Sequence, residues 1–346
     1  LVKVLVAMSG GVDSSVAAAL LLEAGHQVTG ATMKLWGGAS DTGCCSVADV
    51  DDARRVAQQL GIDHFTFGFS DDFEADVVAP YVAAHAAGRT PNPCIECNRH
   101  LKFDRFLRRA DALRFDAIAT GHHARVVEAD GRWQLRRGAD PAKDQSYVLH
   151  VLGQDALART LLPVGDLAKV DVRALASRMG LRTAGKPDSQ DVCFITATGG
   201  RTVFLAPRLH LTPASVVDAE GAVLGTVPAV QLVTIGQRRG LGLPGGGPAR
   251  FATAVDVAGG TVTVGSADDL LVDELHVEDL TWVDQPAEGE VEVQVSAHGD
   301  ARPARLHGIG DGGAVVVLDE PTRRVAPGQS VVLYRGDVVL GGGIAA

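Results

Sequence analysis

Residues 9–14, with the sequence SGGVDS, lie directly between an apolar run and a segment with a helical pattern. The two glycines let the backbone turn sharply and bring its N–H groups against a phosphate, and the start of the following helix adds more N–H groups and partial positive charge. The string therefore predicts an anion site at the junction of a strand and a helix. An ordinary glycine-rich turn is the alternative interpretation.

The same string differs from a Walker A loop, which carries a lysine before its last Ser or Thr. Asp13 occupies that region in this chain. We therefore expect a divalent cation, Mg²⁺, held by the phosphates and by Asp13, to supply the positive charge that such a lysine would provide.

Two segments carry thiols that could act as nucleophiles. Cys94 and Cys97 follow a proline-rich stretch, and we expect Cys97 at the start of a helix. A helix N-terminus and nearby Arg and Lys side chains both lower the pKa of a thiol. Cys193 lies in a polar segment, DSQDVCF, much later in the chain. Each cysteine taken alone could equally be a small buried apolar side chain.

Basic residues are concentrated on the expected helix around and after Cys97. They are Arg99, His100, Lys102, Arg105, Arg108 and Arg109. We consider phosphate contacts with a nucleic acid, and the solvated face of an amphipathic helix is the alternative. The chain of 346 residues has a formal net charge of −10, which argues against a non-specific polyanion binder but leaves room for a specific one.

Composition limits the class of protein further. The five cysteines are an odd and sparse set, so reactive or metal-bound thiols are favoured over a disulfide scaffold. The sequence has neither a long apolar stretch nor the pattern of a signal peptide, so nothing indicates a membrane or export. We expect a cytoplasmic protein.

Short β-like runs alternate with helical segments up to about residue 195, which predicts a parallel sheet covered by helices, with ligands at the C-terminal ends of the strands. Expected strands are 2–8, 28–35, 63–69 and 115–121, and expected helices are 14–24, 47–60, 71–87, 98–113, 153–161 and 171–179. After about residue 200, Val-rich alternating segments predict two small β domains. We therefore expect domains at 1–200, 201–272 and 273–346.

The SGGVDS string resembles the PP-loop of N-type ATP pyrophosphatases, which split ATP between the α and β phosphates and transfer AMP to a substrate oxygen. Nearly the whole chain resembles the bacterial tRNA-uridine 2-sulfurtransferases, or tRNA 2-thiouridylases. The matching segments are AMSGGVDS (7–14), GCCS (43–46), TPNPCIECN (90–98), TGHH (120–123), KDQSY (143–147), SQDVCF (189–194), TIGQRRGLG (234–242) and PGQS (327–330).

This resemblance implies a Rossmann-like PP-loop domain, a central β-rich domain and a C-terminal β-barrel. It implies ATP-dependent 2-thiolation of the wobble uridine of tRNA, in which adenylation turns the C2 oxygen into a leaving group. Cys193 would carry a persulfide, delivered by a donor such as a cysteine desulfurase or a sulfur-relay protein. Cys97 would be the second catalytic thiol and end in a Cys97–Cys193 disulfide.

The resemblance also assigns binding residues by position. ATP would bind to Ala7, Met8, Ser9, Gly10, Gly11, Val12, Asp13, Ser14, Met33 and Gly121. Asn92, Pro93 and Cys94 would line the flipped wobble base, which must leave the anticodon stack to be reached. His122, Lys143, Asp144, Gln145 and Gln329 match positions that contact tRNA.

The chain departs from the family at two places. Cys94 stands where many relatives carry Asp, so an acid role cannot be transferred to it, and an Arg-Tyr pair of relatives is replaced near residues 295–298. Cys44 and Cys45 match the family, and we expect them to pack as structural residues.

Three alternatives remain open from the sequence. Cys94, Cys97 and Cys193 could ligate a [4Fe-4S] cluster with one open iron position, in place of a persulfide pair. A PP-loop enzyme acting on a small molecule would leave the two separated thiols unexplained. A non-catalytic RNA-binding protein with a structural zinc would need a fourth ligand.

Overall fold

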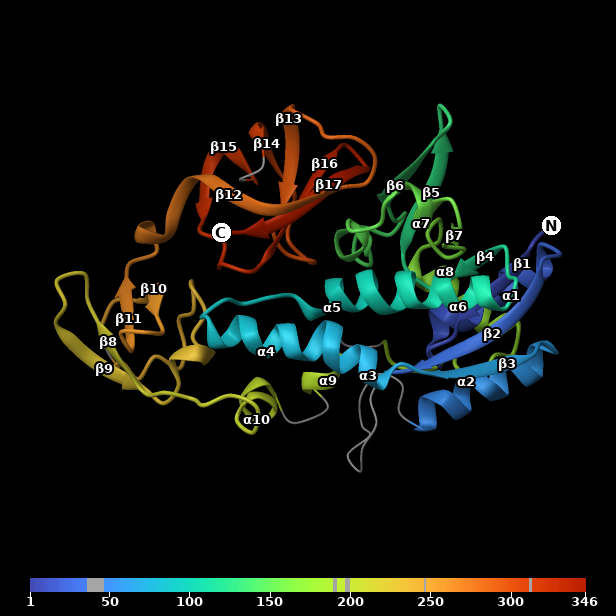
Figure 1. Cartoon of the computed structure of the whole chain (residues 1–346), viewed down its shortest axis with the longest axis horizontal. Coiled ribbons are helices and arrows are strands. Elements are labelled where there is room, and N and C mark those ends of the chain that lie inside the picture. Colours follow the sequence, from blue (N-terminus) through green and yellow to red (C-terminus); the bar gives the residue numbers. More distant parts are fainter. Residues whose placement is uncertain (36–46, 189–191, 197–199, 246, 311–312) are drawn as a thin grey trace.

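The computed structural model describes residues 1–35, 47–188, 192–196, 200–245, 247–310 and 313–346, with Cys193, Thr196 and Ile309 described by backbone alone. The expected positions Cys44, Cys45 and 189–191 lie outside these ranges. Figure 1 shows three parts: an α/β domain that carries the N-terminus, a small β domain, and a β-barrel that carries the C-terminus.

The N-terminal domain is built on a sheet of five parallel strands in the order β3-β2-β1-β4-β7. The strands are β1 (Lys3–Ala7), β2 (Gln27–Lys34), β3 (His64–Gly68), β4 (Ala117–Ala119) and β7 (Thr160–Leu161). This arrangement confirms the predicted Rossmann-like sheet. Its C-terminal strand ends gather at one edge, where ligands of such sheets bind.

Strand β1 shows why both faces of the sheet are covered. Val4 and Val6 pack into one apolar core, whereas Leu5 and Ala7 pack into another. Successive side chains of a strand point to opposite faces, so a continuous apolar run needs helices on both sides. The first core includes α1 (Val12–Glu23), α2 (Val47–Leu60) and α8 (Lys169–Arg178).

The second face is covered by two longer helical segments. The first comprises α3 (Ser70–Phe73), the π-helical η1 (Glu74–Val78) and α4 (Ala79–Ala86); the second comprises α5 (Pro93–Glu96), the π-helical η2 (Cys97–Arg105) and α6 (Phe106–Ala112). The expected helix at 98–113 thus begins at Pro93. Asn92 caps it by accepting a hydrogen bond from the Cys94 N–H at 3.1 Å, and proline suits the first helical turn because it lacks the N–H that would be unpaired there.

Two other expectations for this domain were incomplete. Residues 153–161, expected as one helix, form the short α7 (Gln154–Leu157) followed by strand β7. The sequence analysis missed the hairpin of β5 (Ala124–Ala129) and β6 (Arg132–Arg137). Short helices also occur at η3 (Ser146–Leu149), α9 (Cys193–Thr196) and α10 (Arg201–Leu205).

The rest of the chain is β-rich, as predicted. The central sheet has the order β10-β11-β8-β9, from β8 (Ala214–Val217), β9 (Val223–Val227), β10 (Phe251–Asp256) and β11 (Thr261–Gly265). The C-terminal strands are β12 (Leu271–Trp282), β13 (Gly289–Gln294), β14 (Arg302–Gly310), β15 (Gly313–Arg323), β16 (Ser330–Arg335) and β17 (Val338–Ala345). Pairing of β12 with β17 closes them into the predicted barrel. We keep 1–200, 201–272 and 273–346 as proposed domain limits, although the second limit falls inside β12.

Backbone hydrogen bonds help to join the barrel to the N-terminal domain at two junctions, β17 with β6 and Pro327 with Thr90. Strand β17 pairs with β6 through Val338 and Arg136, so the hairpin extends the barrel sheet (Figure 1). The second junction is Thr90, whose N–H donates to the Pro327 carbonyl at 2.7 Å and whose hydroxyl lies 3.3 Å from that of Thr234 in the central domain. All three domains therefore meet directly before the start of α5.

Candidate active site

A cavity of about 480 Å³ lies at the C-terminal edge of the parallel sheet. Its walls come from the end of β1, the start of α1, β2, the segments after β4 and β6, the start of α8, helix η2 and a loop of the barrel. The lining residues are Ala7, Met8, Ser9, Gly11, Val12, Asp13, Ser14, Met33, Leu35, Lys102, Thr120, Gly121, His122, His123, Ala142, Lys143, Asp144, Gln145, Tyr147, Val148, Lys169, Pro187, Asp188, Ala297 and His298.

The predicted anion loop forms one wall of this cavity. Gly10 has a φ of +74°, and α1 begins at Val12 with Gly11 as its N-cap, without a capping side chain among the described residues. The first N–H groups of a helix have no partner inside the helix, so the start of α1 offers donors to an anion. Within the loop, the Ser9 N–H donates to Ser14 Oγ at 3.2 Å, and this hydroxyl donates to the Gly11 carbonyl at 3.2 Å.

Glycine is needed where Gly121 approaches the loop. A Cβ atom at Gly121 would lie 2.5 Å from the backbone nitrogen of Ser14. Real side chains do not approach a backbone atom that closely, so any larger residue would push the end of β4 away from α1 and move one wall of the cavity. This contact explains why a glycine follows β4.

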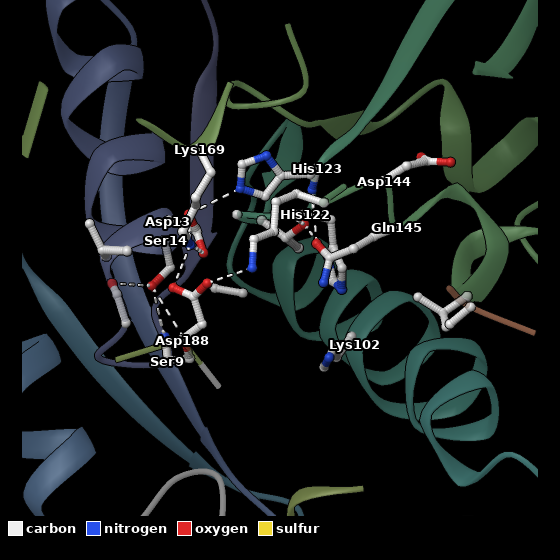
Figure 2. A pocket seen from close by; sticks show the side chains of 18 of the residues that line it. Ser9, Asp13, Ser14, Lys102, His122, His123, Asp144, Gln145, Lys169 and Asp188 are labelled. Atoms are coloured by element: carbon white, nitrogen blue, oxygen red, sulfur yellow. Dashed lines mark hydrogen bonds and ion pairs between the residues drawn. The ribbon is translucent and has the colours of Figure 1, made fainter. Parts of the chain in front are cut away.

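Charged side chains converge beside the loop (Figure 2). Lys169 Nζ lies 2.8 and 2.7 Å from the two carboxylate oxygens of Asp13, and 2.9 Å from Asp188. The His123 Nε2–H donates to Asp13 at 3.1 Å, and Lys143 Nζ donates to Asp188 at 2.8 Å. The cavity therefore contains paired carboxylates and ammonium groups in direct contact.

These contacts decide the ionisation of the two carboxylates. Burial opposes the charge of Asp13, but hydrogen bonds from His123 and Lys169 outweigh burial and lower its pKa. Burial likewise opposes the charge of Asp188, but hydrogen bonds from Lys143 and Lys169 outweigh burial and hold its pKa below the usual value. The hydrogen bond to Asp188 raises the pKa of Lys143. Both carboxylates and the Lys143 ammonium are therefore charged at neutral pH.

Another lysine fixes the outer side of the loop. Lys186 Nζ donates to the Gly10 carbonyl at 3.0 Å, to Asp49 at 2.6 Å and to Asp52 at 2.9 Å. Burial would lower the pKa of Lys186, but the bonds to Asp49 and Asp52 raise it. This residue ties the loop to the start of α2 and is committed to a structural role.

The sequence analysis did not single out Lys169, Lys186 or His123 individually. Their partners lie far away in sequence, so no local pattern marks them. A weak signal existed for Lys169, because it lies just before the expected helix 171–179, at a sheet edge where helix starts gather.

The structure brings most of the expected binding residues together. Every expected ATP-binding residue except Gly10 lines the cavity, as do His122, Lys143, Asp144 and Gln145 from the expected tRNA set. His122 is buried, its Nδ1 lies 2.7 Å from the Thr120 hydroxyl, and burial lowers its pKa well below the usual value. It is therefore a neutral imidazole at physiological pH.

Asp144 and Gln145 are engaged within the protein. Asp144, with a side chain 7% exposed, accepts hydrogen bonds from Arg137 at 3.0 Å and from the N–H groups of Gly138 and Ser146. Arg137 continues to Gln294 of the barrel at 2.9 Å. Gln145 Oε1 accepts the His123 N–H at 2.9 Å. Asp144 thus braces the cavity wall against the barrel.

The thiol region is defined as Cys94, Cys97 and helix α9. Cys94 and Cys97 lie on the helical segment α5–η2, whose Lys102 lines the cavity. Cys97 is 9% exposed and lies beyond the first turn of the helix that begins at Pro93. The expectation that Cys97 starts the helix was therefore wrong, and the first-turn position belongs to Cys94. The Val192 N–H donates to Cys94 Sγ at 3.3 Å. Cys193, the first residue of α9, directly follows Val192 in the chain, so its backbone lies close to Cys94.

Four expected tRNA-binding residues, Gln329 and residues 92–94, lie outside the residues that line the cavity. Gln329 Nε2 donates to the Thr90 carbonyl and helps to hold the barrel against the start of α5. Residues 92–94 form the start of that helix. The same helical segment reaches the cavity through Lys102, and Asn98 Nδ2 donates to the carbonyl of the lining residue Val148 at 3.0 Å.

The basic residues of this helical segment are mostly paired with carboxylates. Arg105 contacts Asp72 at 3.0 Å and Asp76 at 3.3 Å, and Arg108, with a side chain 69% exposed, contacts Asp104 at 2.8 Å. These contacts support the solvated-face interpretation for Arg105 and Arg108. Lys102, by contrast, lines the cavity.

The described side chains contain no cluster of three or more His, Cys, Asp and Glu residues with the geometry of a metal site. Mg²⁺ needs only one or two carboxylates when phosphates supply its other ligands. Asp13 and Asp188 both line the cavity, so the donors present fit a phosphate-bound Mg²⁺.

Within the described part of the chain, no helix combines the length and apolar character that a bilayer crossing requires.

Three family models match consecutive parts of the chain. The tRNA methyl transferase HUP domain matches residues 2–197, the tRNA methyl transferase PRC-barrel domain matches residues 202–266, and the aminomethyltransferase beta-barrel domain matches residues 272–345. The tRNA-specific 2-thiouridylase MnmA of Chloroflexus aurantiacus is 47% identical over 350 residues, covering 99% of this chain and 97% of that protein. The enzyme of the same name from Mycobacteroides abscessus is 47% identical and covers 99% of both chains.

Solved structures are similar over about half of the chain. A 4-thiouridine synthetase in complex with RNA and bound ATP is 18% identical, with a TM-score of 0.38, and covers 58% of this chain and 47% of that one. The U34-tRNA thiolase NcsA of Methanococcus maripaludis, with its [4Fe-4S] cluster, is 18% identical, with a TM-score of 0.35, and covers 54% of this chain and 60% of that one.

Proposed function

The chain belongs to the tRNA-specific 2-thiouridylase family, and from this premise we propose that it replaces the C2 oxygen of the wobble uridine of tRNA by sulfur, using ATP. It is a tRNA sulfurtransferase. The observation that carries the detailed proposal is the cavity, because residues of the SGGVDS loop and Lys143, Asp144 and Gln145 of the KDQSY segment line the same cavity. A phosphate site and a nucleic-acid site that share a cavity suit the transfer of AMP to a base.

Adenylation is the first proposed step. The C2 oxygen of uridine attacks the α phosphorus of ATP, and the bond to the β phosphate breaks with its electron pair leaving on pyrophosphate. The start of α1 supplies N–H donors to the phosphates, and the neutral ring of His122 lies in the same cavity to contact the base or its ribose. Bound Mg²⁺ would be held by the phosphates with Asp13 and would offset their negative charge.

Sulfur transfer is the second proposed step. The terminal sulfur of a Cys193 persulfide attacks C2, and AMP leaves with the oxygen. The Cys97 thiolate then attacks Cys193 Sγ, which releases 2-thiouridine and leaves a Cys97–Cys193 disulfide for a thiol reductant to open. The Val192–Cys94 hydrogen bond supports this proposal, because it holds the segment that carries Cys193 against the helix that carries Cys97. Asn92, Pro93 and Cys94 would contact the flipped base, and Gln329 would hold the barrel beside them.

The sulfur comes, in this proposal, from a persulfide donor such as a cysteine desulfurase or a sulfur-relay protein. We place the reaction in the cytoplasm, where bacterial tRNA and ATP are found. The decisive experiment incubates the chain with tRNA, ATP, Mg²⁺ and a sulfur donor. We expect 2-thiouridine by mass spectrometry of the nucleosides, together with AMP and pyrophosphate. Release of ADP and inorganic phosphate would contradict adenylation.

A second candidate for the thiol region is a [4Fe-4S] cluster held by Cys94, Cys97 and Cys193. The contact between Val192 and Cys94 favours it as well, because it draws three cysteine positions together. Such a cluster would bind sulfide at an iron that lacks a protein ligand. Anaerobic purification separates the two: stoichiometric iron and an inactive Cys94→Ser enzyme would establish the cluster, whereas an iron-free and active one would establish the persulfide route.

A further inference from the structure

Lys169 is the ammonium group in closest contact with the SGGVDS loop. Its Nζ lies 2.7 and 2.8 Å from the carboxylate of Asp13, which belongs to that loop, and 2.9 Å from Asp188. Its side chain is only 11% exposed and lines the cavity (Figure 2). A long, flexible lysine side chain is held in this way only where the surroundings fix it, so its position is a built feature of the site.

The backbone of Lys169 is fixed as firmly as its side chain. Helix α8 begins at Lys169, and the Lys169 N–H donates to Asp140 at 2.9 Å. Helices α1 and α8 share one apolar core, in which Val12 and Val16 lie with Val172 and Ala176. The ammonium group and the phosphate loop are therefore mounted on the same packed pair of helices.

The other lysines near the loop are used differently. Lys186 is bound to the Gly10 carbonyl and to two aspartates behind the loop. Lys143 contacts Asp188, and Lys102 approaches from helix η2 on another wall of the cavity. Among the lysines whose contacts the structure gives, Lys169 is the one that touches a loop side chain facing the cavity.

We propose that Lys169 contacts the phosphates of ATP and stabilises the charge that develops on the departing pyrophosphate, and that Asp188 is a positioning residue that holds this ammonium before ATP binds. The proposal rests on the ATP-dependent function proposed above. Lys169 would thus perform, from a helix far away in sequence, the task that a Walker lysine performs within its own loop. Electrons of the breaking P–O bond move to pyrophosphate, and Lys169 donates hydrogen bonds without losing its proton.

The test measures binding of ATP and of inorganic pyrophosphate to the full chain by calorimetry, in EDTA, so that no metal contributes. We expect Lys169→Met to weaken both affinities by roughly 10- to 100-fold, as expected for one lost hydrogen bond to a charged group. Lys169→Arg keeps the charge and retains part of the affinity. Lys3→Met is the control, because Lys3 is exposed at the start of β1 and lies outside the residues that line the cavity, so its loss should leave pyrophosphate affinity unchanged.

A double variant separates phosphate contact from mere neutralisation of the Asp188 carboxylate. If Lys169 only offset the charge of Asp188, then Lys169→Met/Asp188→Asn would bind ATP like the wild type, and the inference would be overturned. We expect this double variant to stay defective. Equal binding by Lys169→Met and wild type would also refute the inference, whereas a wild-type chain that binds neither ligand even when Mg²⁺ is restored would refute the proposed function itself.

A measurement on the unmodified protein avoids any folding defect of the variants. Acylation of lysines, mapped by mass spectrometry, reports whether a ligand covers each amine. We expect pyrophosphate to protect Lys169 and to leave Lys3, which is exposed at the start of β1, equally reactive. Unchanged reactivity of Lys169 at saturating pyrophosphate would contradict the proposed contact.

Discussion

The phosphate cavity and the thiol region surround their reactive groups with opposite kinds of residue. In the cavity, Asp13, Asp188, Lys143 and Lys169 lie in direct ionic contact. Cys97 instead belongs to an apolar core that includes Ile95, Leu101 and Phe194. The difference suits the proposed chemistry, because a departing pyrophosphate would need fixed charges around it, whereas a persulfide would need protection from water and from stray thiols. The two half-reactions should therefore be separable by mutation.

The largest expected effect breaks the sulfur half and leaves the phosphate half intact. Cys193→Ser should abolish 2-thiouridine formation, because serine cannot carry a persulfide, while tRNA-dependent release of pyrophosphate continues. Cys97→Ser should also stop turnover but leave Cys193 able to accept labelled sulfur. The measurements are nucleoside mass spectrometry and a pyrophosphate assay on the same samples. A Cys193→Ser enzyme that still made 2-thiouridine would end this assignment.

A variant of the cavity should have the opposite effect and disrupt the phosphate half while the sulfur half stays intact. Asp13→Ala removes the partner of both Lys169 and His123, and should abolish pyrophosphate release because the loop and its cations lose their arrangement. Binding of tRNA, measured by filter retention, should survive, and so should sulfur loading of Cys193. Loss of sulfur loading in this variant would show that the two regions are not independent.

Acid should act on a buried histidine and on the cavity carboxylates at different pH values. Burial lowers the pKa of His85, which packs on Tyr81 in the same apolar core as Cys97, to about 4. The unfolded chain protonates this histidine below about pH 6.5 and the folded chain does not, so the free energy of unfolding falls as the pH drops from 6.5 toward 4, by roughly 1–3 kcal/mol. Asp13 and Asp188 have lowered pKa values, so their stabilisation persists above about pH 4 and is lost only below it.

Denaturant unfolding across this pH range tests the assignment. His85→Asn can keep the hydrogen bond to the Gln231 carbonyl, and it removes the titrating group. Its unfolding free energy should therefore vary less between pH 6.5 and 4 than that of the wild type. An identical pH profile in both proteins would show that other groups cause the loss.

A moderate effect is expected where the cavity is braced against the barrel. Asp144→Ala leaves Arg137 without its carboxylate partner and should lower the free energy of unfolding by roughly 1–3 kcal/mol, since Arg137 keeps partial access to water. Asp337→Ala is a suitable control, because it removes a more exposed carboxylate from Arg125. If Asp144→Ala weakened tRNA binding and left stability unchanged, Asp144 would be a direct tRNA contact instead.

The smallest effect is expected on the outer helix face. Arg105 is already paired with Asp72 and Asp76, so Arg105→Ala should cost at most about 1 kcal/mol of stability. It should also weaken tRNA binding less than Lys102→Ala, because Lys102 faces the cavity. Salt-dependent binding curves for the two variants make the comparison. A larger effect of Arg105 would restore the phosphate-contact interpretation for the basic cluster.

The sequence predicted features that depend on neighbouring residues. The order strand, glycine turn and helix at residues 3–23 follows from local patterns, and so does the alternation that makes a parallel sheet. A readable signal for the start of α5 was overlooked, since Asn92 followed by Pro93 is typical of an N-cap and a first helical residue.

The remaining features depend on contacts between distant parts of the chain. Lys169 meets Asp13 across 156 positions, and Arg137 meets Gln294 across 157. Apart from the position of Lys169 near an expected helix start, nothing local distinguishes such residues from other charged side chains. The β5–β6 hairpin is similar, because its role depends on a pairing with β17 at the far end of the chain.

Thr90 has a consequence for how this protein can be divided. Its N–H and carbonyl are both bonded to the barrel, through Pro327 and Gln329, and its hydroxyl lies against Thr234 of the central domain. Removing the barrel would expose both backbone groups three residues before the first residue of the helix that carries Cys94 and Cys97, and would leave an edge of β6 unpaired. The three domains are therefore poorly suited to exchange between relatives. In a chimaera, residues 89–92 must fit the new barrel, or the helix that carries Cys94 and Cys97 will start at a different residue.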